Sequence, residues 1–163
     1  MKKLFLMLVL ALPFALNAQK LGYINTQELF SQMPELNQVK LRLDTLQGQY
    51  ETQLANMQEE FNKKVAAFQS EQATLTDGVK EFRQQELAEM EQRIQLFYQT
   101  AQQDIQKKQQ EFLAPLHEKM TKAIQEVGNA EGYLFIFDSA AMAYISQEAV
   151  DVMPQVKVRL GIK

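Results

Sequence analysis

The chain has 163 residues, of which 17 are basic and 20 acidic, and it contains no cysteine. This length predicts one domain with at most one extended excursion. The 46% hydrophobic residues exclude a globally disordered chain. The absence of cysteine excludes disulfide bonds and thiolate metal sites within the chain. The net charge of −3 disfavours nucleic-acid binding, because that affinity depends mainly on cations that neutralise phosphates.

Residues 1–18 have the composition of a cleaved secretory signal peptide. Lys2 and Lys3 precede an apolar run at 4–12, and Ala18 stands at the expected cleavage point. Cleavage is favoured over a retained anchor, because a membrane-spanning helix needs roughly 20 apolar residues. Removal takes away two lysines and no acidic residue, which leaves a charge of −5. Secretion in a two-membrane bacterium predicts a periplasmic protein that works without ATP.

A short strand is predicted next, over residues 20–24, because it is a compact run of apolar and aromatic residues. Asn25, with Glu28 three residues later, resembles a capping box that opens a short helix through Ser31. Pro34 ends this segment and can serve as the first residue of the following helix.

A long helical tract follows, in which apolar residues recur mostly at steps of three or four. Such spacing predicts one continuous apolar stripe along a helix. Thr76-Asp77-Gly78 predicts a single reversal near residues 74–79, with Gly78 free to take whatever backbone angle the turn requires. Two long helices joined by a short turn pack antiparallel. The stripe comprises Leu36, Val39, Leu43, Leu46, Tyr50, Leu54, Met57, Phe61, Val65 and Phe68 before the turn, and Val79, Phe82, Leu87, Met90, Ile94, Phe97, Ala101, Ile105 and Phe112 after it.

Pro115 is predicted to kink or stop the returning helix, because proline cannot donate the helical hydrogen bond. The sequence thus divides into a hairpin arm at 34–113 and a body formed by 19–33 and 114–163. Each arm helix spans roughly 55–60 Å at 1.5 Å per residue. Helical character resumes after Pro115 and ends at Gly128 or at Gly132.

The remaining segment predicts two strands, at 133–137 and 143–146. Asp151 can cap a final short helix, although the alternation of Val156, Val158 and Leu160 would also suit a strand. A sheet of three short strands is marginal and has open edges, so oligomerisation is expected. The residues predicted to form this oligomerisation body are Leu21, Tyr23, Ile24, Tyr133, Phe135, Phe137, Tyr144 and Ile145.

Short motifs at both ends of the mature chain are distinctive. They are Lys20-Leu21-Gly22-Tyr23-Ile24-Asn25-Thr26 with Met33-Pro34-Glu35, and Ala123-Ile124, Glu131-Gly132-Tyr133, Asp138-Ser139 and Leu160-Gly161-Ile162-Lys163. They resemble the Skp/OmpH-like periplasmic chaperones. The resemblance implies a mainly α, α+β chain, in which a long coiled-coil hairpin projects from a small β body that completes a barrel in a homotrimer. It also implies a non-enzymatic holdase that binds unfolded outer-membrane proteins between its arms before membrane insertion.

Charge is where the sequence departs from this family, whose best-known members are strongly basic. Residues 34–113 carry nine basic and thirteen acidic side chains. This balance argues against lipopolysaccharide binding and against charge-driven capture of acidic clients. Most of the stripe is expected to form the seam between the two helices. The client-contact residues predicted are Phe61, Phe68 and Phe82 toward the tip, and Leu96 and Tyr98 at or beyond the edge of the stripe.

A structural coiled coil that links folded envelope proteins is the alternative. Fast hydrogen exchange near residues 70–85 would favour the chaperone, and uniformly slow exchange the strut. An enzyme is disfavoured, because nothing places a nucleophile or an oxyanion donor beside the carboxylates of Glu28 and Asp138. His117 is the only histidine and is read as a surface residue. No cofactor or metal site is expected.

Overall fold

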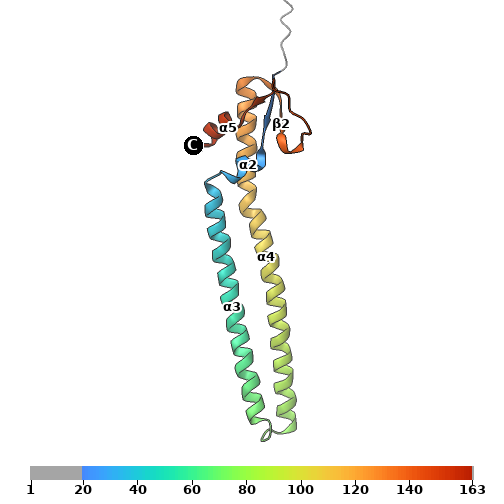
Figure 1. The fold of residues 1–163 in the computed structure, drawn as a ribbon. Helices are drawn as coiled ribbons and strands as arrows, with labels where there is room; N and C mark the ends of the chain where they lie inside the picture. Colours follow the sequence, from blue (N-terminus) through green and yellow to red (C-terminus); the bar gives the residue numbers. More distant parts are fainter. Residues whose placement is uncertain (1–19, 163) are drawn as a thin grey trace, which may run out of the picture. The chain divides into compact units, whose positions relative to one another are not determined.

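The structure, a computed structural model, describes residues 20–162 (Figure 1). The predicted signal segment at 1–18 lies outside these residues. The elements in chain order are β1 (Lys20–Ile24), α2 (Thr26–Ser31), α3 (Glu35–Glu71), α4 (Asp77–Glu131), β2 (Tyr133–Asp138), the 3-10 turn η1 (Ser139–Ala141), β3 (Val150–Asp151) and α5 (Met153–Leu160). The predicted class, mainly α with a small sheet, is confirmed. Within the described residues, no helix combines the length and apolar character needed to cross a membrane.

The described chain divides into two compact units. One contains residues 30–121, and the other contains residues 20–29 and 122–161. Helix α4 contributes to both units, and the boundaries that the sequence predicted, at 33/34 and 113/114, fall inside the first.

The second unit contains a three-stranded parallel sheet in the order β2-β1-β3. Parallel neighbours need a long crossover, and here helices α2, α3 and α4 lie between β1 and β2 in the chain. Leu21 pairs with Phe135 and Tyr23 with Phe137, whereas a register shift after Lys20 leaves Leu134 out of the pairing. Both predicted flanking strands are therefore confirmed as one paired unit.

The two faces of this sheet differ because successive side chains point to opposite sides. Gly22 and Ile24 share the inner face, where Ile24 is 1% exposed. A Cβ on Gly22 would stand 2.9 Å from the Val152 side chain, so only glycine fits this close approach. The fully buried side chains of the unit are Ile24, Leu29, Val152 and Val156, and Ala123 and Val127 of α4 are also buried.

Thr26 donates a hydrogen bond to the carboxylate of Asp138, which ties the start of α2 to the end of β2. That bond, together with the Ala140 N–H, holds the pKa of Asp138 below its usual range. A lowered folded-state pKa adds stability above the unfolded value near 4, and this stability is lost as pH falls through the folded value.

We expect Thr26→Val to remove about 1 kcal/mol of stability at pH 7 and to flatten the acid limb of the stability profile, since the variant keeps side-chain shape and loses one donor. Urea unfolding at fixed chain concentration between pH 3 and pH 7 measures both effects. An unchanged acid limb in the variant would show that Asp138 is not held by this bond.

The first unit is the antiparallel hairpin of α3 and α4 (Figure 1). The reversal lies just before Asp77, and the Thr76 carbonyl accepts the N–H groups of Val79 and Lys80 at 3.0 Å. The turn is predicted at nearly the right place, but Gly78 does not supply its backbone angle. Gly78 lies inside α4, and within the described residues only Gly132 and Gly161 have positive φ.

Pro115 does not stop α4, which continues through it to Glu131, so of the two predicted effects the stop is wrong. Proline at 115 removes the hydrogen bond to the Glu111 carbonyl, at a typical cost of about 3 kcal/mol in a helix interior. Both residues are exposed, so water can reach the freed carbonyl. The apolar stripe also continues beyond the proline through buried Leu116 and Met120, and packing on both sides keeps the helix intact. Helix α4 ends at Glu131. The next residue, Gly132, has a φ of 71° and is one of the two positions at which the sequence predicted the end of this helix.

The predicted strand at 143–146 is wrong, and the third strand is Val150–Asp151. Gly22 and Tyr23 of β1 pair with Val150 and Asp151, so the edge of β1 opposite β2 is occupied by β3 and not by the earlier run. The final helix is confirmed over the strand alternative: Asp151 Oδ1 accepts the Met153 N–H at 2.9 Å, and α5 ends at Gly161 with φ 73°.

Candidate functional site

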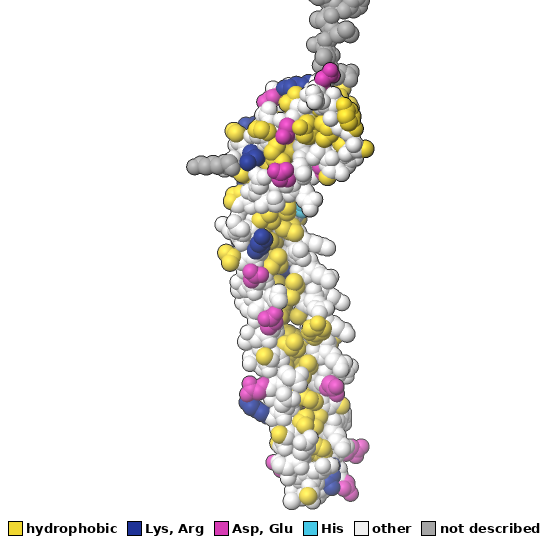
Figure 2. Space-filling view, viewed as in Figure 1, with side chains coloured by type: hydrophobic (Ala, Val, Ile, Leu, Met, Phe, Trp, Pro, Cys, Tyr) yellow, Lys and Arg dark blue, Asp and Glu magenta, His cyan; other side chains and the backbone are white. Residues whose placement is uncertain are grey.

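The seam of the hairpin is mostly the predicted stripe. Val39, Met90 and Ala101 are buried along it. In the space-filling view, hydrophobic side chains follow a line along the hairpin between polar margins (Figure 2). The main role of the stripe is therefore to hold the two helices together, and its buried residues are not available for other contacts.

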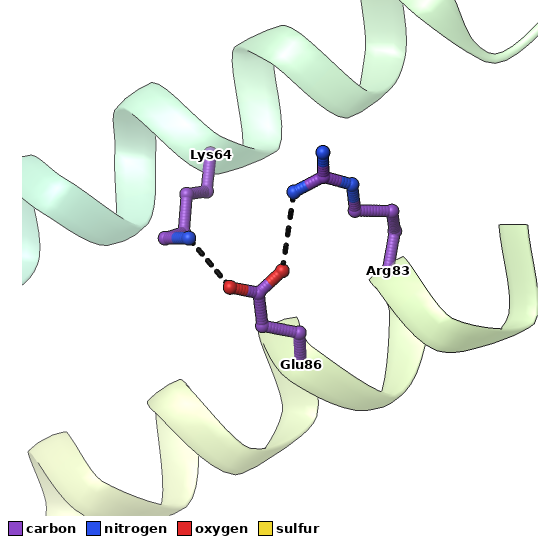
Figure 3. A network of polar contacts seen from close by, with 3 residues as sticks. All are labelled: Lys64, Arg83 and Glu86. Atoms are coloured by element: carbon purple, nitrogen blue, oxygen red, sulfur yellow. Dashed lines mark hydrogen bonds and ion pairs between the residues drawn. The ribbon is translucent and has the colours of Figure 1, made fainter. Parts of the chain in front are cut away.

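Polar contacts fix the register of α3 against α4. Near the tip, the Glu86 carboxylate accepts from Lys64 of α3 at 2.5 Å and from Arg83 of α4 at 3.3 Å (Figure 3). The Lys64 hydrogen bond is the main cause that lowers the pKa of Glu86, so this carboxylate is ionised at neutral pH. Toward the other end, Lys119 forms an ion pair with Glu35. Each of these ion pairs is partly exposed and contributes little to the stability of the hairpin. Their effect is therefore to set the register of α3 against α4.

The predicted client-contact residues differ in exposure. Phe82, Leu96 and Tyr98 are 65%, 61% and 51% exposed, whereas Phe61 and Phe68 are half-buried in the seam. Phe82 belongs to the stripe by spacing but lies open, because a two-helix seam has little to cover it close to the turn. That these residues touch clients stays a prediction.

The outer face of the sheet carries an apolar surface, formed by Leu21 and Tyr23 of β1 and Phe135 and Phe137 of β2. Their places follow from the register and the alternation of the strands. Leu21, Phe135 and Phe137 are 43%, 55% and 38% exposed, and the two phenylalanine rings lie 5.7 Å apart. We call these four residues the apolar sheet face. A monomer in water rarely leaves such a contiguous surface uncovered.

The other predicted body residues lie elsewhere. Ile24 is in the core of its own chain, so it cannot contact a partner directly. Tyr133 is half-buried under the ammonium of Lys20, which stands 4.0 Å from the ring centroid. Tyr144 is 79% exposed in the segment after η1, and Ile145 beside it is half-buried. Sequence reasoning missed Leu134, Met142 and Val158, which are also exposed. The Leu134 position depends on the register shift, for which the sequence gives no signal.

Residues that could have carried chemistry have structural roles. His117 is an exposed residue, as predicted, and its ring stacks on Phe30 with 4.2 Å between centroids. Asp138 is held by Thr26 and by the Ala140 N–H. Across residues 20–162, no cluster of His, Asp and Glu could hold a metal ion.

Comparison with known proteins assigns the family. The sequence model of the family described as "Outer membrane protein (OmpH-like)" matches residues 20–160. The chain belongs to the OmpH-like family. A protein named "Chaperone protein Skp" from Yersinia enterocolitica is 24% identical over 153 residues, covering 92% of this chain and 93% of its own. A protein of the same name from Vibrio cholerae is 26% identical over 141 residues, which cover 78% of this chain and 75% of that protein.

A solved structure confirms the likeness at the level of fold. The crystal structure of an OmpH-like protein from Caulobacter crescentus CB15 superposes with a TM-score of 0.76 at 18% identity, covering 87% of this chain and 83% of that chain. The OmpH-like relatives are non-enzymatic chaperones, and this chain is not an enzyme.

Proposed function

We propose that this OmpH-like protein is an ATP-independent periplasmic holdase, which binds unfolded outer-membrane proteins and keeps them from aggregating before membrane insertion. The observation that carries the proposal is the hairpin itself. It buries part of its apolar stripe between the two helices while Phe82, Leu96 and Tyr98 remain exposed. Relatives named as Skp chaperones, matched over most of their length, support the same function.

We further propose that three chains associate through the apolar sheet face. Each chain contributes a small parallel sheet whose outer strands, β2 and β3, have one neighbour each. Joining such edges and burying Leu21, Phe135 and Phe137 would complete a closed barrel and remove an aggregation-prone surface. Three hairpins then surround one client, and many weak contacts add as avidity.

Holding is expected to be mainly apolar. The segment at 34–113 is net acidic, with nine basic and thirteen acidic residues, and many of its exposed positions are glutamine. We therefore expect weak salt dependence of client binding and no tight binding of lipopolysaccharide, whose phosphates need cations. The signal-like composition of residues 1–18 supports a periplasmic location, where binding energy alone must drive the work.

The test mixes the purified mature protein with a urea-unfolded outer-membrane β-barrel protein and follows light scattering after dilution. We expect suppression of aggregation at a small molar excess of trimer, unchanged by ATP, because binding only the unfolded state lowers the concentration free to aggregate. A soluble protein that refolds quickly serves as control and should refold with little retention. Scattering equal to that of the client alone would reject the proposal.

A further inference from the structure

An open groove of about 550 Å³ lies between α3 and α4 along the hairpin. Its apolar wall is formed by Tyr50 and Leu54 of α3 and by Phe97, Tyr98, Ala101 and Ile105 of α4. The rest of the lining is three glutamines and Glu51. This volume lies within the range of roughly 300–1,000 Å³ that is typical of ligand sites.

Two contacts hold Tyr50 of α3 against α4 beside this groove. Tyr50 packs edge-on against Phe97, with 5.8 Å between ring centroids, and its hydroxyl donates to Asp104 Oδ2 at 2.8 Å. Phe97 and Asp104 lie about one turn before and after Ala101 on the same face of α4, so Tyr50 stands across from the Ala101 methyl group. Ala101 is 7% exposed and is part of the groove's lining. The bond to Asp104 and the contact with Phe97 brace the ring as one wall of the groove.

The chemistry of the lining selects its occupant. Three aromatic rings offer faces and edges to an apolar or aromatic side chain. The lining holds no lysine or arginine and includes the Glu51 carboxylate, so an acidic side chain is disfavoured there. Each glutamine side chain both donates and accepts hydrogen bonds, which suits the unpaired backbone amides of an extended chain. Strands of transmembrane barrels alternate apolar and polar residues and carry aromatic girdles, so they supply such side chains.

A second groove on the hairpin differs in charge. It has about 430 Å³ and is lined by Leu41, Arg42, Lys108 and Phe112 among others, with the Arg42 guanidinium 5.8 Å from the Phe112 ring centroid. Because the two grooves carry opposite charges, the charged residues of a bound segment decide which of the two grooves it favours.

We propose that the groove at Tyr50 and Ala101 is a subsite for one aromatic side chain of an unfolded segment that lacks acidic neighbours. The inference rests on the proposed holdase function and names a place on each arm where a client is held. Tyr98, 51% exposed and part of the lining, forms its rim.

The test uses a fluorescent synthetic peptide that alternates phenylalanine and glutamine between terminal lysines, and a matched peptide with serine for phenylalanine. Ala101→Leu places a larger side chain in the groove. It should weaken binding of the phenylalanine peptide about tenfold, as measured by fluorescence anisotropy, which is within the range by which one or a few methylene groups change affinity in an apolar site. Ala88→Leu adds the same group at an exposed position of α4 and should leave binding within twofold. Circular dichroism checks that both variants fold.

A second readout does not depend on filling the groove. A photo-crosslinking benzoylphenylalanine in place of Tyr98 should capture the phenylalanine peptide well above the level seen at exposed Gln84. Equal affinity of Ala101→Leu and wild type, or equal crosslinking at positions 98 and 84, would overturn the subsite. If the wild type still suppresses barrel aggregation in that case, the holdase function stands and only the subsite falls.

Discussion

Replacing Phe137 with glutamate is expected to turn the proposed trimer into monomers and to abolish the proposed suppression of aggregation. Phe137 belongs to the apolar sheet face, opposite Tyr23 in the register and with 5.7 Å between its ring centroid and that of Phe135. A carboxylate there must either lose its hydration without a partner or keep the chains apart, and an unpaired buried charge carries a penalty of several kcal/mol. We expect the association constant to fall by at least about 100-fold, which corresponds to roughly 3 kcal/mol.

Sedimentation velocity measures this change directly. Val79→Glu is the matched control, because Val79 is 40% exposed, close to the 38% of Phe137, but lies at the start of α4 in the hairpin. The control should remain trimeric. A Phe137→Glu variant that still sediments as three chains would show that the apolar sheet face is not the subunit interface.

Replacing Leu29 with alanine is expected to destabilise the protein by about 2–5 kcal/mol, the usual range for a buried leucine. Leu29 is 0% exposed although α2 is only six residues long, so burial of this side chain is a main reason that α2 holds its place. Leu41→Ala, at a leucine that is 66% exposed on α3, should change stability by less than about 0.5 kcal/mol.

Urea unfolding followed by far-UV circular dichroism compares these two variants. Chain concentration must be held fixed, because the stability of an oligomer depends on it. Equal unfolding midpoints for the two leucine variants would mean that Leu29 is not part of the core.

Most of the fold prediction rests on the spacing of apolar residues, because a long stripe at steps of three or four fits an amphipathic helix and few other structures. The predicted stop at Pro115 failed because local propensity was weighed without the packing beyond it, where Leu116 and Met120 are buried. The strand at 143–146 failed for a similar reason: strand propensity cannot show that Val150 already pairs with Gly22 on that edge of β1.

The candidate site was harder to predict than the fold. Leu96 and Tyr98 could be expected to be exposed, because they lie off or at the edge of the stripe by spacing alone. The groove could not be predicted from the sequence, because its lining is known only once Tyr50 is seen to stand across from Ala101. The Lys64–Glu86 contact likewise depends on the register between two helices, which their separate sequences do not specify.

Native mass spectrometry of the mature protein mixed with one unfolded outer-membrane barrel protein tests the central proposal most directly. The expected spectrum contains the free trimer and a complex of three chains with one client, and the complex disappears when the client folds into detergent. Phe137→Glu should give neither species. A protein that stays a monomer, or a trimer that never carries the unfolded barrel protein, would contradict the proposed holdase.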